Sequence, residues 1–105
     1  MSVTMVYAVF ADSGEAQRIG RILVEERLAA CINILGPCTS LYCWEGAITQ
    51  ASEVPAILKT THEAAEALIA RLTELHSYEV PAIAAWPVER TSAAYLEWVE
   101  SSVKD

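Results

Sequence analysis

The sequence is poor in positive charge, with seven Lys and Arg residues against fourteen Asp and Glu residues and a formal net charge of −7. Nucleic acids and anionic membrane surfaces are bound by clustered Lys and Arg side chains, so neither kind of partner is expected. The chain also lacks a long apolar run and a basic N-terminal region. We therefore expect no membrane-spanning helix and no secretion signal.

Cysteine and histidine are scarce as well, with three and two residues. An odd number of cysteines cannot all pair within one chain, and without an export signal we expect reduced thiols and a cytoplasmic protein. His62 and His76 lie at the two ends of a predicted helix, about 20 Å apart at 1.5 Å per residue. This distance excludes one ion bound by both histidines of one chain. A metal site shared between copies stays open, because symmetry brings one side chain from each copy together.

No set of catalytic groups is visible in the sequence. The four glycines are scattered and form no phosphate-binding loop, and Ser40 lacks a G-x-S-x-G context. Cys31 lies in the apolar run LAACINIL, which is typical of a buried, unreactive thiol. Cys38 follows Gly-Pro, where exposure is expected, but no histidine lies near it in sequence. We predict that the protein is not an enzyme, and leave open a composite site built between subunits.

The chain does contain an alternation of strand-like and helix-like segments within 105 residues, the size of one domain. Strands are predicted at 3–10, 29–35, 39–48, 53–60 and 80–86, with a turn at 49–52. Helices are predicted after Asp12, Thr60 and Ser92, the first two as capping boxes with Glu15 and Glu63. Gly20 is expected to let the first helix approach the sheet closely. The order predicts an α+β, ferredoxin-like βαββαβ fold with an extra C-terminal helix and a sheet covered on one face only.

Apolar residues make up 53% of the chain, a high fraction for a small soluble protein. Part of this apolar surface is expected to be covered by other subunits. In the segment LYCWEG (41–46), Tyr42 and Trp44 share one face of a predicted strand, and Cys43 and Glu45 share the other. Tyr and Trp are enriched at protein interfaces. The segment is interpreted as a subunit contact rather than an active site.

Lys59 is one of only two lysines and ends the apolar run PAIL. One interpretation is a strand end whose amine reaches solvent. The other is a cation that binds an anionic ligand or a carboxylate such as that of Glu45 or Glu79. The sequence leaves both interpretations open.

The chain resembles the CutA family of divalent-cation tolerance proteins in five segments that follow one another: LVEERLAACINI (23–34), SLYCWEGAI (40–48), ILKTT (57–61), LHSYEVPAI (75–83) and YLEWV (95–99). The resemblance extends from about Val6 to Val99 and indicates a single CutA-like domain over residues 1–105. It implies a tight homotrimer whose architecture is similar to that of PII signal-transduction proteins. No enzymatic reaction is established for the family.

The resemblance also implies where ligands bind. It places Trp44, Glu45, Lys59, Tyr78 and Glu79 in the clefts between subunits. It further implies copper or another divalent cation as a ligand.

Copper ligation in some family members is proposed to use a pair of histidines and a cysteine. His76 matches one of these histidines, whereas Leu75 and Phe10 stand at the other two positions. His76 and Cys38 are therefore the predicted metal ligands, because Cu(I) favours thiolates and Cu(II) favours imidazole. The predicted function is that of a trimeric cytosolic binding and sensing protein in copper tolerance. The alternative is a PII-like signalling module that binds a small anionic effector in the clefts.

Overall fold

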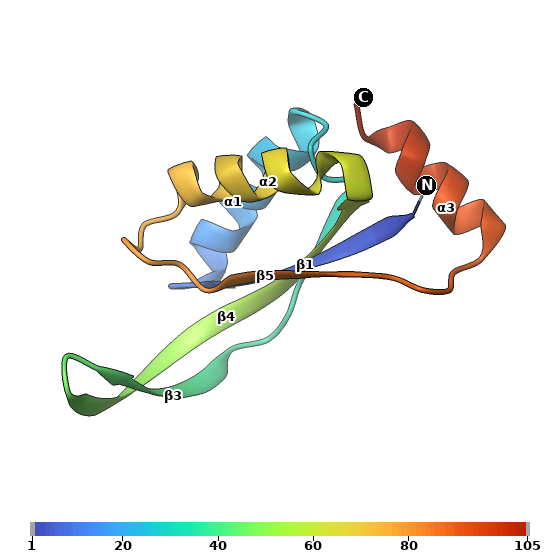
Figure 1. Cartoon of the computed structure of the whole chain (residues 1–105). Helices are drawn as coiled ribbons and strands as arrows, with labels where there is room; N and C mark the ends of the chain where they lie inside the picture. The colour runs from blue at the N-terminus through green and yellow to red at the C-terminus, as the bar shows by residue number, and fades with distance from the viewer. Residues whose placement is uncertain (1, 105) are drawn as a thin grey trace.

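The structure is a computed structural model that describes residues 2–104. Its elements follow the order β1 (Val3–Phe10), α1 (Ser13–Glu25), β2 (Cys31–Ile34), β3 (Cys38–Trp44), β4 (Ala47–Thr61), α2 (His62–Leu75), β5 (Ile83–Pro87) and α3 (Ala93–Ser102). The helices α1 and α2 cover one face of the sheet, whereas α3 lies beyond one end of it (Figure 1). The predicted α+β class and element order are confirmed.

The sheet is antiparallel and is organised around β4. Its strands follow the order β2–β4–β1–β5, and β3 pairs with the outer part of β4. The inner part of β4 pairs with β1 from Val54 to Thr61, while the outer part pairs with β3 from Ala47 to Glu53. The β3–β4 hairpin therefore extends away from the helices as an arm (Figure 1).

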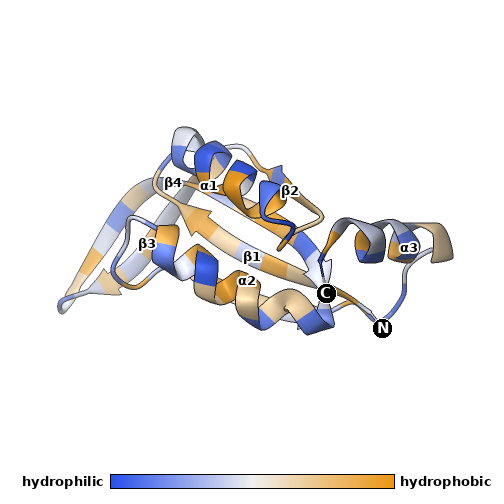
Figure 2. Ribbon diagram, turned by 90° about the horizontal axis from the view of Figure 1, so that it is seen from above, coloured by the Kyte–Doolittle hydropathy of each residue, from blue (hydrophilic) through white to orange (hydrophobic). Residues whose placement is uncertain are grey.

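The core lies between the sheet and the two helices that cover it. Alternate residues of a strand point to opposite faces, and one set from β1 and β4 is buried against apolar residues of α1 and α2. In Figure 2 the apolar strand β1 runs between these two helices. The fully buried members include Val6, Ala8, Phe10, Ile19, Leu23, Ala56, Leu58, Leu68 and Leu72. A smaller cluster joins α3 to the end of the sheet through Val3, Val99 and Val103.

The helix starts follow the predicted capping residues with one exception. The side chain of Asp12 accepts a hydrogen bond from the backbone N–H of Glu15, and that of Ser92 accepts one from Tyr95. At α2 the cap is Thr61, which accepts from the N–H of Ala64. The predicted cap Thr60 is wrong by one residue, because its hydroxyl is buried and donates to the carbonyl of Leu28.

The predicted turn at residues 49–52 is wrong. These residues belong to β4 and pair with β3, and the hairpin instead turns at Glu45 and Gly46. Both turn residues have positive φ angles, 51° and 81°, as in the two-residue turns that join antiparallel strands. Residues 49–52 are polar because this part of β4 lies outside the core, not because the chain reverses there.

Close packing between α1 and β2 depends on Gly20. A Cβ atom at this position would lie 2.9 Å from Cδ1 of Ile32, closer than real Cβ atoms approach other heavy atoms. The absence of a side chain at Gly20 therefore lets the helix approach the strand, as the sequence predicted.

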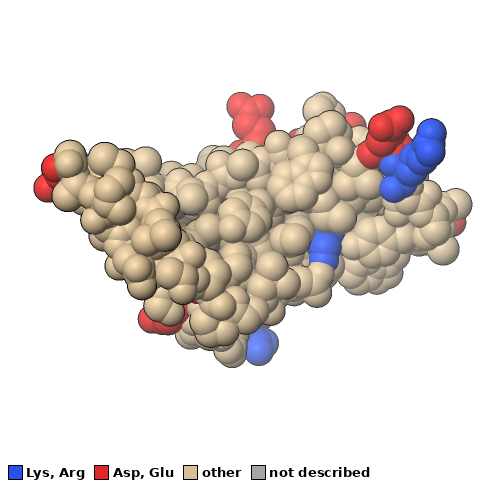
Figure 3. Space-filling model, turned by 90° about the horizontal axis from the view of Figure 1, so that it is seen from below, with Lys and Arg blue, Asp and Glu red and all other residues tan. Residues whose placement is uncertain are grey.

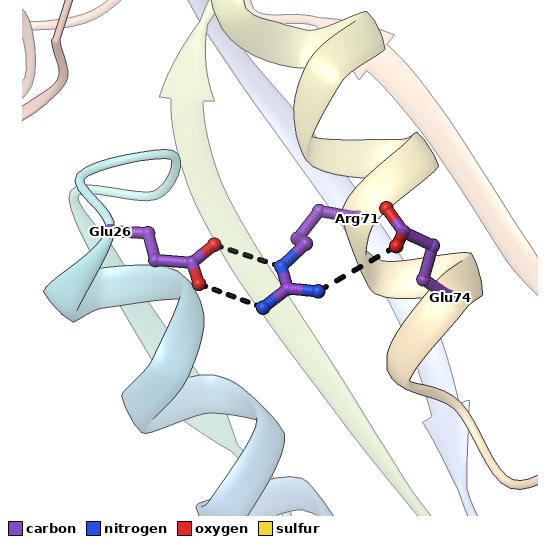
Figure 4. Close-up of polar contacts among 3 residues, drawn as sticks. All are labelled: Glu26, Arg71 and Glu74. Carbon is purple, nitrogen blue, oxygen red and sulfur yellow. Dashed lines mark hydrogen bonds and ion pairs between the residues drawn. The ribbon is translucent and has the colours of Figure 1, made fainter.

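The end of α1 and the middle of α2 are linked by an ion pair (Figure 4). Nε and Nη2 of Arg71 donate to the two carboxylate oxygens of Glu26 at 2.9 and 2.8 Å. Nη1 of Arg71 lies 3.7 Å from Glu74 on the same helix. Both partners of the closer pair are about one third exposed, so its contribution to stability is small.

In the part of the chain that the structure describes, no helix covers the opposite face of the sheet (Figure 1). Register places Lys59 between Met5 and Cys31 on this face, and Met5 is in turn paired with Trp86. Most of the surface seen from this side is uncharged (Figure 3). No side chain of residues 2–104 forms an ion pair with Lys59. Within the same range, no helix is long and apolar enough to cross a membrane.

Candidate functional site

A cavity of about 580 Å³ opens where the β3–β4 hairpin leaves the body of the protein. We call it the Glu53 cavity, after the buried carboxylate among its lining residues. Its wall from β3 includes Leu41, Tyr42 and Trp44, and Tyr78, Glu79 and Val80 line the side formed by the segment before β5. The lining contains two carboxylates and no Lys or Arg.

Tyr78 and Glu53 join the two sides of this cavity. The hydroxyl of Tyr78 donates a 2.6 Å hydrogen bond to Oε2 of Glu53, which is only 8% exposed. Burial and this hydrogen bond raise the pKa of Tyr78 well above its usual range. Tyr78 therefore stays protonated at neutral pH and acts as a hydrogen-bond donor.

His76 fixes the backbone beside Tyr78. Its Nε2 lies 2.8 Å from the carbonyl oxygen of Val9, and its Nδ1 accepts a hydrogen bond from the N–H of Tyr78 at 3.0 Å. A carbonyl only accepts and a backbone N–H only donates, so these contacts specify a neutral imidazole with its proton on Nε2. The ring also stacks on Phe10. His76 is thus a buried positioning residue in this structure.

Glu15 holds the same segment from the start of α1. Its carboxylate accepts from the backbone N–H of Ala11 at 2.9 Å and from that of Ser77 at 3.0 Å. Burial alone would raise its pKa, but the hydrogen bonds from Ser77 and Ala11 hold the pKa of Glu15 below its usual value. The predicted capping-box residue therefore links α1 to a segment more than sixty positions away in the sequence.

Three of the five predicted cleft residues, Trp44, Tyr78 and Glu79, line the Glu53 cavity. Glu45 lies at the exposed hairpin turn and is not part of the lining. Lys59 is six positions from Glu53 along β4, about 20 Å at 3.4 Å per residue. The location of all five between subunits stays a prediction, because it involves other copies of the chain.

The predicted metal ligands, His76 and Cys38, do not form a complete metal site within the described residues. Both ring nitrogens of His76 already have backbone partners. Cys38 is half-buried, and its Sγ lies 3.7 Å from Oγ of Ser40. Residues 2–104 contain no group of three His, Cys, Asp or Glu side chains placed to hold one ion. Metal ligation by His76 and Cys38 stays a prediction, and it requires ligands from a second copy.

The sequence gives no sign that Glu53 faces a cavity or that Glu15 reaches Ser77. Glu53 stands at the start of a predicted strand, where exposed acidic residues are common. Both contacts depend on how residues 76–80 fold back, and no local pattern encodes that path. The available signal is compositional: a Tyr two residues after a His at the end of a helix, in a chain with only two His and four Tyr residues.

Comparison with known proteins identifies the family. The family described as CutA1 divalent ion tolerance protein matches residues 4–102, nearly the whole chain. The chain belongs to this family. The expectation drawn from the five sequence segments is confirmed.

Individual CutA proteins show how close the relationship is. The divalent-cation tolerance protein CutA of Thermotoga maritima is 42% identical over 99 residues, which cover 94% of this chain and 97% of that protein. A crystal structure of CutA from Xylella fastidiosa superimposes with a TM-score of 0.95 at 34% identity, covering 99% of this chain and all of that one. The chain spans a smaller share, 60%, of the CutA homolog of Danio rerio, with 37% identity over 90 residues, which are 86% of this chain.

Proposed function

We propose that the protein is a cytosolic, non-catalytic module of divalent-cation tolerance that acts as a homotrimer and binds its metal between subunits. Membership of the CutA1 family carries this proposal. Copper is the metal we propose first. The cleft around Trp44, Glu45, Lys59, Tyr78 and Glu79 is the proposed ligand-binding region.

Two features of the described chain support assembly. The face of the sheet opposite α1 and α2 carries Met5, Lys59 and Trp86 with no helix above them. On the hairpin arm, Leu41 is 68% exposed and Ile48 is 78% exposed. Apolar side chains exposed to this extent on a two-stranded arm favour coverage by another chain.

A shared metal site is supported by the spacing of the candidate ligands. Glu45 and Glu79 are exposed carboxylates, and Cys38 and Cys43 supply thiols on β3. Residues 2–104 of one chain gather too few of these groups for a metal ion, which needs about four or more protein or water ligands. Symmetry around a trimer axis multiplies each ligand threefold.

Native mass spectrometry of the full chain, purified without chelators and then titrated with copper, tests this proposal. We expect a mass of three chains with a whole number of copper ions, and weaker binding in Cys38→Ser and His76→Gln. Glu97→Gln, an exposed change on α3, is the matched control. A monomer would contradict the assembly, and a trimer that stays metal-free would contradict the metal site.

The position of Lys59 favours one alternative, a signalling module that binds a small anion. Its amine belongs to a mostly uncharged face and forms no ion pair within residues 2–104. A half-buried ammonium without a carboxylate partner is suited to an anionic ligand. Titration with inorganic phosphate should then raise the midpoint of thermal unfolding of the parent and of the control variant Lys104→Met. The midpoint of Lys59→Met should not change. Equal responses of Lys59→Met and the parent would eliminate this alternative.

A further inference from the structure

We propose that His76 serves metal binding as a positioning residue: it fixes the backbone of Tyr78 for the cleft between subunits and does not itself ligate the metal ion. This inference rests on the proposed function and assigns a role to one residue of the proposed site. Its basis is that both ring nitrogens of His76 are hydrogen-bonded to the backbone of its own chain.

The ring nitrogens of His76 are the first argument. A histidine ligates a metal ion through the lone pair of a ring nitrogen, and both nitrogens of His76 are already used within residues 2–104. Its Nε2 carries the proton and donates to the carbonyl oxygen of Val9, while its Nδ1 accepts the N–H of Tyr78. Ligation would break one of these bonds and leave a backbone group without its partner. A second copy of the chain does not change this, because both bonds lie within one chain.

The packing of the imidazole ring is the second argument. Phe10 stacks on the ring with the centroids 5.2 Å apart and an interplanar angle of 15°. The ring of Tyr78 lies 4.9 Å away at an angle of 54°. Only 8% of His76 is exposed in the described chain. Turning the ring toward an ion would disrupt both aromatic contacts, so the packing holds the ring in the orientation in which it bonds to the backbone.

The path of the chain after α2 shows what these bonds position. The backbone N–H of His76 donates to a carbonyl of α2, and that of Ser77 donates to Glu15. The next N–H, that of Tyr78, donates to the ring of His76. This bond spans two positions, the spacing at which an Asn or Asp side chain stabilises a turn. His76 therefore sets the direction in which the chain continues toward Tyr78 and Glu79, two residues of the proposed ligand-binding region.

Substitutions at His76 separate positioning from ligation in a copper titration of the full chain. His76→Asn keeps an acceptor two positions before the N–H of Tyr78 but removes the imidazole. His76→Leu keeps neither. We expect the copper affinity of His76→Asn to stay within about threefold of the parent and that of His76→Leu to fall by about tenfold or more. His62→Gln, which changes the exposed histidine at the start of α2, is the matched control.

Two results of this titration would overturn the inference. Equal losses in His76→Asn and His76→Leu would do so, because both variants lack an imidazole and only ligation treats them alike. An unchanged affinity in His76→Leu would show that the position of Tyr78 does not matter for metal binding. The weaker copper binding expected of His76→Gln has the same cause as in His76→Leu, since its longer side chain reaches toward Val9 and not toward the N–H of Tyr78.

A spectroscopic measurement tests ligation directly. The chain contains two histidines, so His76 is the only imidazole in an untagged His62→Gln variant. Pulsed electron paramagnetic resonance of Cu(II) bound to this variant should show no modulation from the remote nitrogen of a coordinated imidazole. The presence of this modulation would identify His76 as a ligand and overturn the inference.

Amide hydrogen exchange of the metal-free protein tests the positioning role without copper. The N–H of Tyr78 should exchange about tenfold faster in His76→Leu than in the parent, and His76→Asn should restore the slower exchange. Equal exchange in all three proteins would overturn the inference whether or not copper binds. A protein that binds no copper but shows the expected exchange pattern would contradict the proposed metal function and still support the positioning of Tyr78 by His76.

Discussion

The carboxylate of Glu15 and the backbone N–H of Ser77 form a 3.0 Å hydrogen bond across 62 positions of sequence. Glu15 belongs to the first turn of α1, and Ser77 lies just after α2. Through Ser77 this bond orients the segment that carries Tyr78 and Glu79 into the Glu53 cavity. The start of one helix thus positions the lining of a site built mainly from the hairpin.

Glu15→Ala should lower the free energy of unfolding by about 1–3 kcal/mol, because it removes the acceptor of two part-buried hydrogen bonds, from the N–H groups of Ala11 and Ser77. Glu15→Gln should cost less, since its amide oxygen replaces one acceptor. Urea denaturation measures both. Gln17→Ala on the exposed side of α1 is the control, and a Glu15→Ala variant as stable as this control would contradict the assigned role.

Stability should also fall in acid because of Glu15. Its pKa in the folded protein lies below the ordinary value of 4.5, so the unfolded chain takes up the proton first as the pH falls. The stabilisation is complete above pH 4.5 and is lost as the pH falls through the pKa of the folded protein. The free energy of unfolding, measured by urea denaturation between pH 7 and pH 3, should fall less steeply with decreasing pH for Glu15→Gln than for the parent. The exposed change Glu97→Gln should leave the slope unaltered, and an identical slope in all three proteins would argue against a lowered pKa at Glu15.

Gly20→Ala should destabilise the protein by about 1–2 kcal/mol, although alanine favours helices, because its methyl group collides with Ile32. Gly14 lies in the same helix, but a Cβ there meets only ordinary contact at 3.4 Å. Gly14→Ala should therefore be neutral or slightly stabilising. Thermal or urea unfolding of the pair tests this contrast. A Gly20→Ala protein as stable as Gly14→Ala would mean that Ile32 moves aside at no cost.

Glu45→Asn should stabilise the hairpin arm by about 0.5–1 kcal/mol, because asparagine adopts positive φ angles more readily than glutamate. Gly46→Ala should weaken it, since φ at Gly46 is 81°. The effect is local, so amide hydrogen exchange in β3 and the outer part of β4 is the suitable measurement. Unchanged protection of these amides in both variants would show that the turn does not limit the stability of the arm.

Much of the fold could be predicted because residues that are close together in the sequence determine it. The buried strand β1, the caps at Asp12 and Ser92 and the apolar stripe of α2 each depend on neighbouring residues. The position of the hairpin turn was harder to predict, because residues 49–52 have the polarity of a turn but the geometry of an exposed strand. Only pairing with β3 distinguishes the two.

The site could be predicted only in part. Trp44, Tyr78 and Glu79 belong to segments that resemble the CutA family, and the structure places them around one cavity. The roles of Glu53 and His76 arise from contacts between elements far apart in the sequence. A carboxylate gains a buried partner, and an imidazole loses its free nitrogens, only when those elements meet.

The place of β4 in the sheet has a consequence for the order in which the chain acquires its structure during synthesis. β1 is made before the other described elements, and both of its neighbours, β4 and β5, are made later. The first strand must therefore wait unpaired until residues 54–61 emerge, and its second edge stays open until residues 83–87 follow. Before residues 54–61 emerge, α1 is the one helix of the described chain already made that packs against the apolar side chains of β1, so the nascent chain depends on this helix to avoid premature association.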